Sequence, residues 1–189
     1  MTITQINTDG YNKFTLFPLV SSEIIQFLLE HEELIFKLLF YNDADAYKND
    51  PAHPNLTISQ KRALIYKGSG DQSDYRIFMG IGMDSAFTSQ ATILRITPSR
   101  VVPVERTIGN MTVTLEIYSH SQIDTLSNLE QRSNMIAQRL IELLNGQTVG
   151  QLGPLWFSRG SKYNNDSEMI IGASLPFKAV IIKMCNWVT

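Results

Sequence analysis

Apolar and polar residues alternate along the segment 111–118. Every second residue from Met111 to Ile117 is apolar, and the residues between them are threonine or glutamate. Because successive residues of a strand point to opposite faces of the sheet, this pattern predicts a strand with one buried face. The sheet that contains it therefore needs a layer that covers that face.

A helical period follows this strand after a short polar stretch. Apolar residues recur at steps of three and four between Thr125 and Asn145, and the pair Asn145-Gly146 is a typical helix end. The pattern predicts an amphipathic helix over 125–145 that packs on the apolar face of the sheet. Its apolar positions are Leu129, Met135, Ile136, Leu140, Leu143 and Leu144.

A second, more uniformly apolar helix is predicted over residues 22–41, because its apolar positions cover more than one stripe. Ser21 and Ser22 supply capping side chains at its start. Residues 1–20 alternate weakly and contain Pro18, which disfavours helical backbone at the preceding residue. They are predicted to form an extended N-terminal arm.

The next part of the chain carries turn signals and short elements. Residues 42–54 are acidic and contain two prolines, which predicts a loop. Thr57 and Gln60 have the spacing of a capping box, so a short helix is expected to start there, with Lys61 on its exposed side. Residues 75–82 are predicted to form a strand or hairpin arm.

Strand signals dominate the rest of the chain. Residues 92–97 are predicted to form a strand antiparallel to 111–118, and Pro98 excludes a central strand position after it. The segment 147–168 is rich in glycine and proline and is expected to be largely loop. Residues 169–184 are β-branched and nearly alternating, which predicts a closing strand or two strands broken at Pro176.

These elements predict an α+β protein with a mostly antiparallel sheet, one long amphipathic helix packed on one face, and an N-terminal helix. A chain of 189 residues is long enough for one ordinary core and short for two. We therefore expect a single α+β domain over residues 1–189.

Composition narrows the classes of function. A net charge of -2 and a pI near 5.9 argue against binding to nucleic acid through neutralisation of its phosphates. The single cysteine, Cys185, excludes an internal disulfide framework and favours a reducing compartment. The apolar stretch 24–41 is interrupted by charged residues, and the N-terminus lacks a secretory pattern, so no membrane span is expected.

Candidate catalytic and metal-binding residues are scattered. His31, His53 and His120 lie far apart in the sequence, without a motif that would place a nucleophile beside them. Asp43, Asp45, Asp50 and His53 are residue types that bind metal ions, but their spacing lacks the glycine and distal glutamate of a calcium loop. A solvated acidic loop is the favoured interpretation. No catalytic residue, metal site or cofactor is predicted, and the chain is not expected to be an enzyme.

The predicted loop 150–167 has the composition of a protein interaction site. It mixes large aromatic side chains with cations, as the centres of protein interfaces do. The alternative is that Trp156 and Phe157 fold back onto the core and leave only a solvated tip. The predicted partner-binding residues are Trp156, Phe157, Arg159, Lys162 and Tyr163.

The order strand, strand, long helix, variable loop and closing aliphatic strand is carried by residues 112–146 and 158–184, with the N-terminal helix before them. In this order the chain resembles the tail terminator and tail completion proteins of long-tailed bacteriophages of the lambda type. In that family a strand is followed by a polar turn and a helix, and a loop then leads to a closing edge strand. Residues 42–91 have no counterpart in the smaller members and would be an insertion.

The resemblance implies a structural virion protein without chemistry. Its subunits would form a ring, commonly a hexamer, that caps the tail tube and docks to the head connector at the neck. It would be made in the host bacterial cytoplasm and touch other virion proteins, but neither a membrane nor a specific nucleic acid sequence.

Three alternatives remain open at this stage. The first is another neck protein, such as an adaptor or stopper at the head–tail connection. The second is a small cytoplasmic enzyme whose site is assembled from residues such as Asp43, Asp45 and His120. The third is a monomeric binding module that uses the loop 159–163.

Overall fold

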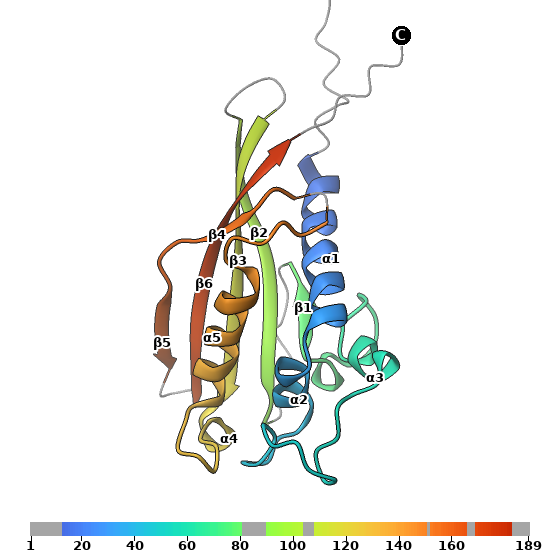
Figure 1. Ribbon diagram of the computed structural model, residues 1–189, viewed down its shortest axis with the longest axis vertical. Coiled ribbons are helices and arrows are strands. Elements are labelled where there is room, and N and C mark those ends of the chain that lie inside the picture. Colours follow the sequence, from blue (N-terminus) through green and yellow to red (C-terminus); the bar gives the residue numbers. More distant parts are fainter. Residues whose placement is uncertain (1–12, 81–89, 104–107, 151, 166–168, 183–189) are drawn as a thin grey trace, which may run out of the picture.

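A computed structural model describes residues 13–80, 90–103, 108–150, 152–165 and 169–182. Helices lie on one side of a twisted sheet (Figure 1). The elements in chain order are α1 Lys13–His31, α2 Leu34–Phe40, α3 Ile58–Ala63, the 3-10 turn η2 Gln72–Asp74, β1 Ile77–Met79, β2 Thr92–Pro103, β3 Ile108–His120, α4 Ser121–Asp124, α5 Arg132–Leu144, β4 Leu155–Phe157, β5 Ser161–Asn165 and β6 Ile170–Ile182.

The six-stranded sheet has the order β1-β2-β3-β6-β4, and β5 also pairs with β6. Among the strand pairs of the described residues, β1–β2 alone is parallel, and the others are antiparallel. This arrangement confirms the predicted α+β class with a mostly antiparallel sheet. The closing strand, however, is not an edge strand: β6 runs unbroken between β3 on one side and β4 and β5 on the other.

The predicted alternation in β3 is confirmed. Met111, Val113, Leu115 and Ile117 are buried, because they face the helices and belong to the main core. From α5, the side chains of Ile136, Leu140 and Leu144 enter the same core and are fully buried. Leu143, predicted in the buried stripe, is only partly buried at its margin.

Leu129 does not belong to this stripe, so that prediction is wrong. The helix begins at Arg132, and the preceding residues form a tight turn in which Leu129 N donates to Leu126 O at 2.9 Å. Leu129 has a φ of 67° and is 87% exposed. The turn closes through the bridge between Thr125 and Gln131, so these residues cannot also continue a helix.

The predicted N-terminal arm is also wrong where the structure describes it, because α1 already begins at Lys13. Pro18 lies near the start of the helix, where its missing N–H removes only one backbone hydrogen bond. The burial of Val20, Ile24 and Leu28 farther along α1 stabilises the helix despite that loss. Residues 1–12 lie outside the described part.

The helix expected over 22–41 is divided into α1 and α2. Glu32 lies at the break and is buried, and its Oε1 accepts a hydrogen bond from Ile35 N at 3.0 Å. A carboxylate that accepts a backbone N–H in this way satisfies a donor at the start of α2. The Glu32 side chain therefore favours a new helix start over a continuous helix.

The segment 42–91 contributes Ala46, Leu56, Leu64, Ile65 and Ile77 to the main core. The predicted capping box is confirmed, because Gln60 N donates to Thr57 Oγ1 at 3.3 Å and Thr57 N donates to Gln60 Oε1 at 2.9 Å. Lys61 is not exposed as predicted but buried. Its Nζ donates to Glu32 O at 2.7 Å and to Glu33 Oε1 at 2.6 Å, so the charge is matched by the end of α1 and by a carboxylate.

Strand β2 continues past Pro98, where the sequence predicted its end. Leu94 N points toward β1, since it donates to Arg76 O, and the two-residue period turns the nitrogen of Pro98 to the same side. β1 reaches only to Met79, opposite Ile96, so no ladder hydrogen bond is lost at Pro98. A register shift between Pro98 and Val101 follows directly.

Arg132 joins α5 to the end of α2. It is fully buried, and no described carboxylate forms an ion pair with it. Its guanidinium instead donates to backbone carbonyls: to Leu38 O at 2.7 Å, to Asp43 O at 2.5 Å, to Ile123 O at 3.0 Å and to Tyr41 O. Two of these carbonyls belong to the C-terminal turn of α2, where partial negative charge accumulates.

Candidate functional site

The segment predicted as a loop over 147–168 contains two short strands that lie end to end along β6. Phe157 pairs with Phe177 in β4, and Ser161 pairs with Ser174 in β5. The chain thus takes one more residue between these pairs than β6 does, which is the geometry of a bulge. β4 and β5 form an interrupted outer strand. The far side of β4 is engaged by the end of α5 and the turn after it: Gly146 N donates to Leu155 O at 2.6 Å, Leu155 N donates to Gln147 O at 2.9 Å, and Phe157 N donates to Asn145 Oδ1 at 2.9 Å. The far side of β5 has no partner strand within the described residues.

Pro176 explains the position of the interruption. It lies opposite the break and has no N–H to donate to a neighbouring strand. Its carbonyl instead accepts a hydrogen bond from Ser158 N at 2.9 Å. Gly160 follows, and a Cβ there would lie 3.2 Å from Ser174 O, so the close approach of the two backbones favours glycine.

The two aromatic residues of β4 have opposite environments. Phe157 is partly buried, and its ring lies 5.5 Å from the ring of Phe177 at the edge of the core. Trp156 is 54% exposed and pairs in register with Lys178 of β6. The prediction of a partner-binding aromatic therefore stays open for Trp156, while Phe157 folds onto the core.

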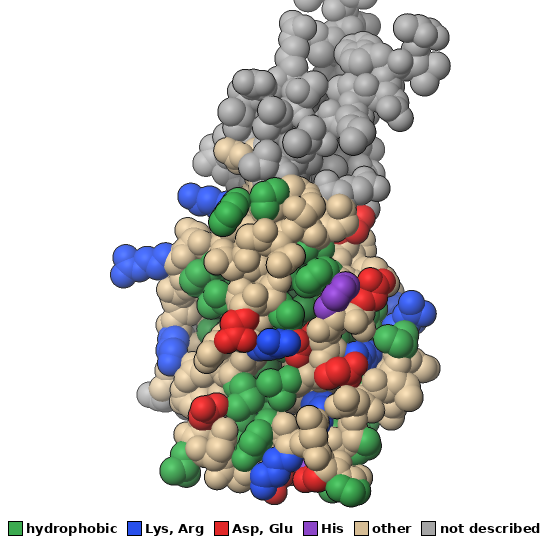
Figure 2. Space-filling view, in the orientation of Figure 1, with side chains coloured by type: hydrophobic (Ala, Val, Ile, Leu, Met, Phe, Trp, Pro, Cys, Tyr) green, Lys and Arg blue, Asp and Glu red, His purple; other side chains and the backbone are tan. Residues whose placement is uncertain are grey.

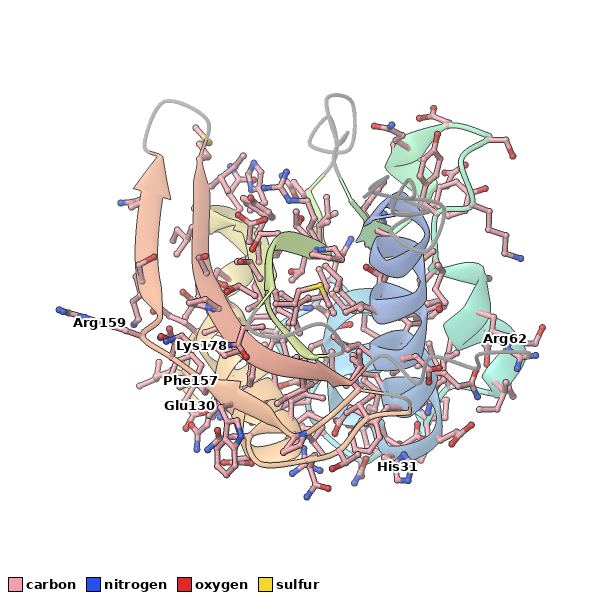
Figure 3. The ribbon with its side chains drawn as sticks, turned by 90° about the horizontal axis from the view of Figure 1, so that it is seen from above. His31, Arg62, Glu130, Phe157, Arg159 and Lys178 are labelled. Carbon is pink, nitrogen blue, oxygen red and sulfur yellow. The ribbon has the colours of Figure 1, made fainter. Side chains whose placement is uncertain are left out.

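Three cations lie along this edge of the sheet: Lys178 pairs in register with Trp156, Arg159 lies in the interruption between β4 and β5, and Lys162 pairs with Ala173, whose side chain faces the core. Arg159 and Lys162 are exposed, as is Lys178, and none of them has an ion-pair partner in the part of the chain that the structure describes. Figure 3 labels Arg159, Phe157 and Lys178 on the same side of the molecule. In Figure 2, Lys and Arg side chains project from the side where Figure 1 places β5. We call Trp156, Arg159, Lys162 and Lys178 the basic edge.

The sequence missed Lys178, because it lies in an aliphatic strand far from the predicted loop. Its position in the alternation of that strand is the signal that places it on the solvent side, since its neighbours Phe177 and Ala179 are buried. The side chain of Tyr163, which was also predicted to bind a partner, lies outside the described residues. Cys185 lies outside them as well.

The acidic loop brings a histidine between two carboxylates. His53 Nε2 lies 2.9 Å from Asp43 Oδ1, and Nδ1 lies 2.9 Å from Asp50 Oδ1. Ionised carboxylates only accept hydrogen bonds, so both ring nitrogens must carry a proton when both contacts form. The hydrogen bond to Asp43, with a further contribution from Asp50, raises the pKa of His53 above its ordinary value.

This cluster does not have the arrangement of a catalytic site. A base needs a free nitrogen, and both nitrogens of His53 are engaged. Asp45 instead pairs with Lys48 at 2.7 Å, and that hydrogen bond lowers the pKa of Asp45. His120 is the third residue of the enzyme hypothesis. Its Nδ1 accepts a hydrogen bond from Gln122 N at the start of α4, and it makes no described contact with Asp43 or Asp45.

His31, the remaining histidine, is a surface residue of α1. Its ring stacks on Phe27 with centroids 4.5 Å apart. Among the described residues, no three His, Cys, Asp or Glu side chains are arranged to hold a metal ion. No described helix is long and apolar enough to cross a bilayer.

The family model YomW matches residues 32–179, which is more than half of the chain. The chain belongs to the YomW family. The matched range extends from the start of α2 through most of β6, so it includes the acidic loop, the whole of α5 and the basic edge. None of the curated proteins matches the chain.

Proposed function

We propose that this YomW-family chain is a structural virion protein of a tailed bacteriophage. Its role would be that of a ring-forming tail terminator or tail completion protein at the head–tail junction. The order of elements supports the proposal, because β2, β3, α5, the interrupted outer strand and β6 follow one another as in those proteins. By the same resemblance the ring is a hexamer, assembled after synthesis in the host bacterial cytoplasm.

The basic edge is the observation that carries a docking role. The far side of β5 has no partner strand within the described residues, so β5 can accept a further strand from a partner through main-chain hydrogen bonds. Trp156 supplies an exposed aromatic anchor next to Lys178, and the cations along the basic edge favour an acidic partner surface. In the proposed role this partner is another virion protein, either the tail tube or the head connector.

Ring formation is tested first, by measuring the native mass of the purified protein and by imaging negatively stained particles. The proposal expects a closed assembly of several subunits. A protein that stays monomeric from micromolar to millimolar concentration, with and without the tail tube, contradicts it.

Docking is tested with the double variant Arg159→Glu, Lys162→Glu. Both side chains are exposed, so the free energy of unfolding should change by less than about 0.5 kcal/mol. We expect the variant to form rings but to lose attachment to tail tubes or connectors. The matched control Arg159→Lys, Lys162→Arg keeps both charges and should attach normally. Normal yields of infectious particles from the charge-reversed variant would exclude the basic edge as the docking site.

A further inference from the structure

A rigid turn presents an apolar side chain beside a carboxylate. Leu129 is 87% exposed, although its backbone is fixed in the left-handed region at a φ of 67°. Leu126 N donates to Glu130 O at 2.9 Å, and Ser127 N donates to Ala44 O at 2.9 Å, so the turn is held at both ends. An ordered, exposed leucine in a conformation that leucine rarely adopts indicates a functional constraint. We call Leu129 and Glu130 the knob.

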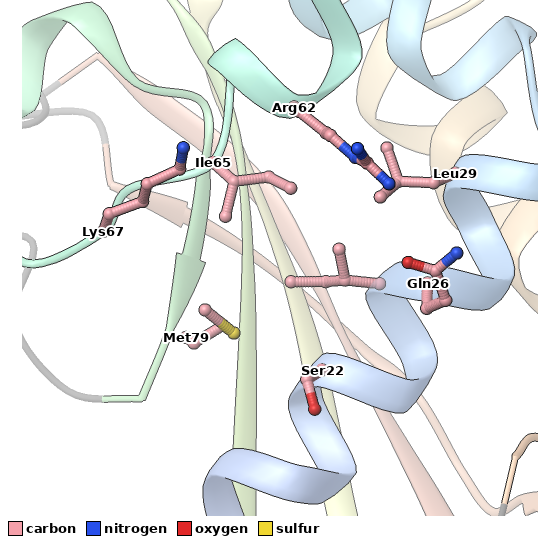
Figure 4. A pocket seen from close by; sticks show the side chains of 8 residues that line it. Ser22, Gln26, Leu29, Arg62, Ile65, Lys67 and Met79 are labelled. Atoms are coloured by element: carbon pink, nitrogen blue, oxygen red, sulfur yellow. The ribbon is translucent and has the colours of Figure 1, made fainter. Parts of the chain in front are cut away.

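A groove lined by apolar residues and by two cations lies between α1, α3 and β1 (Figure 4). Its volume is about 220 Å³, larger than the roughly 150 Å³ cavity that accepts a benzene ring in another protein. Arg62 and Lys67 stand at its rim, and no carboxylate lines it. Neither cation has an ion-pair partner among the described residues. The apolar lining consists of Ile25, Leu29, Ile65 and Met79.

The knob and the groove lie on opposite sides of the molecule. Figure 3 labels Glu130 on one side and Arg62 on the other, so the two cannot meet within one chain. They are complementary, because the groove offers apolar surface for Leu129 and cations for Glu130. A contact between two different surfaces of identical subunits is heterologous and closes into a ring when the rotation permits.

We propose that the groove of one subunit binds the knob of a second copy of this chain. Leu129 enters the apolar floor, and the Glu130 carboxylate pairs with Arg62 and Lys67 at the rim. This inference rests on the proposed ring and identifies its subunit contact. The basic edge is not the occupant, because Arg159, Lys162 and Lys178 would face two further cations.

The test uses two variants that each lose one surface. The knob variant Leu129→Asn, Glu130→Lys keeps its groove, and the groove variant Arg62→Glu, Lys67→Glu keeps its knob. Alone, each should remain monomeric. Mixed, they have one intact contact between them, so native mass measurement should find a 1:1 heterodimer that grows no further. If the mixture contains only monomers while the parent protein forms rings, the proposed contact is wrong.

A charge exchange within one chain provides the rescue. Glu130→Lys combined with Arg62→Glu and Lys67→Glu restores opposite charges and should re-form rings, whereas either half alone should weaken association at least about tenfold. Leu129→Asn is the fold control, because asparagine tolerates this backbone conformation better than leucine does. It should melt no lower than the parent protein and still associate at least tenfold more weakly.

The outcomes separate this inference from the proposed function. Rings that form normally in both the knob and the groove variants overturn the contact but leave the neck protein proposal standing. A parent protein that never forms rings overturns both. Variants that lose rings but still bind tail tubes through the basic edge support both.

Discussion

Arg139 Nε donates a hydrogen bond to Glu32 Oε2 at 2.8 Å, and this ion pair joins α5 to the break between α1 and α2. The Glu32 side chain is 1% exposed, whereas that of Arg139 is 39% exposed. The two partners therefore differ in what they lose when the pair is broken. A freed arginine can be hydrated, but a freed carboxylate stays buried without its counter-charge.

This asymmetry predicts the order of two substitutions. Glu32→Gln keeps an acceptor for Ile35 N and should reduce the free energy of unfolding by about 1 kcal/mol. Arg139→Ala should cost more, about 2 to 3 kcal/mol, because it leaves the buried charge unpaired; solvent screening of the exposed arginine keeps the value below that of a fully buried pair. Denaturant unfolding of both single variants and the double variant measures the coupling. Additive effects would mean that the pair contributes nothing.

Leu140 and Leu129 allow the same substitution to be compared at a buried and at an exposed position. Leu140 is fully buried, so Leu140→Ala should cost about 2 to 5 kcal/mol of unfolding free energy. Leu129→Ala removes the same atoms from an exposed side chain and should change stability by less than about 0.5 kcal/mol. Equal losses in chemical denaturation would contradict the packing of α5.

Arg132 should be among the residues most sensitive to substitution. Replacing it with methionine fills a similar space but leaves four carbonyls without their donor. We expect a loss of at least about 3 kcal/mol, since each unsatisfied buried group carries a desolvation cost. Arg132→Lys should recover part of this loss because an ammonium supplies three donors. Urea melts of both variants check the order.

His53 predicts a dependence on pH with a definite sign. Its folded-state pKa is raised above 6.5, so its contribution to stability is fully present below pH 6.5 and is lost as the pH rises through the folded value. The melting temperatures of the parent protein and His53→Gln should differ most near pH 5.5 and converge at alkaline pH. NMR titration of the ring should give a pKa above 6.5.

Asp50 makes the stability of the same loop depend on pH in the acidic range. Although burial opposes the shift, hydrogen bonds from the side chain and backbone of His53 lower the pKa of Asp50 below 3.8. The contribution of Asp50 is therefore present above pH 3.8 and is lost as the pH falls through its folded value. Asp50→Asn should weaken the loop at pH 5.5, where the parent cluster is complete. A melting temperature unchanged at that pH would argue against the cluster.

The period of apolar residues was enough to predict those helices and strands that bury one face and expose the other. The strand 111–118 and the buried positions Ile136 and Leu140 followed from alternation and helical spacing alone, because burial on one side imposes the period. Leu129 fits the helical spacing equally well, but it lies in a turn in which Leu129 N donates to Leu126 O and Leu126 N donates to Glu130 O. Spacing does not show which of two local hydrogen-bonding patterns is used.

Other features depended on contacts between distant segments. Lys61 was predicted to be exposed because it is charged, yet its ammonium meets the end of α1, which is not visible in a local window. The interrupted outer strand was predicted as loop because glycine and proline are frequent there, but pairing with β6 overrides local preference. The basic edge was therefore predicted only through Trp156, Arg159 and Lys162, without Lys178.

The position of β6 inside the sheet has a consequence during synthesis. β3 leaves the ribosome well before β6, and until β6 arrives, β3 has an unpaired side along the thirteen residues that β6 later covers. A long unpaired strand invites pairing with other nascent chains, and non-local strand pairing is slow. Translation speed between residues 121 and 169 should therefore govern how much chain reaches the native state, with chaperones most useful over that interval.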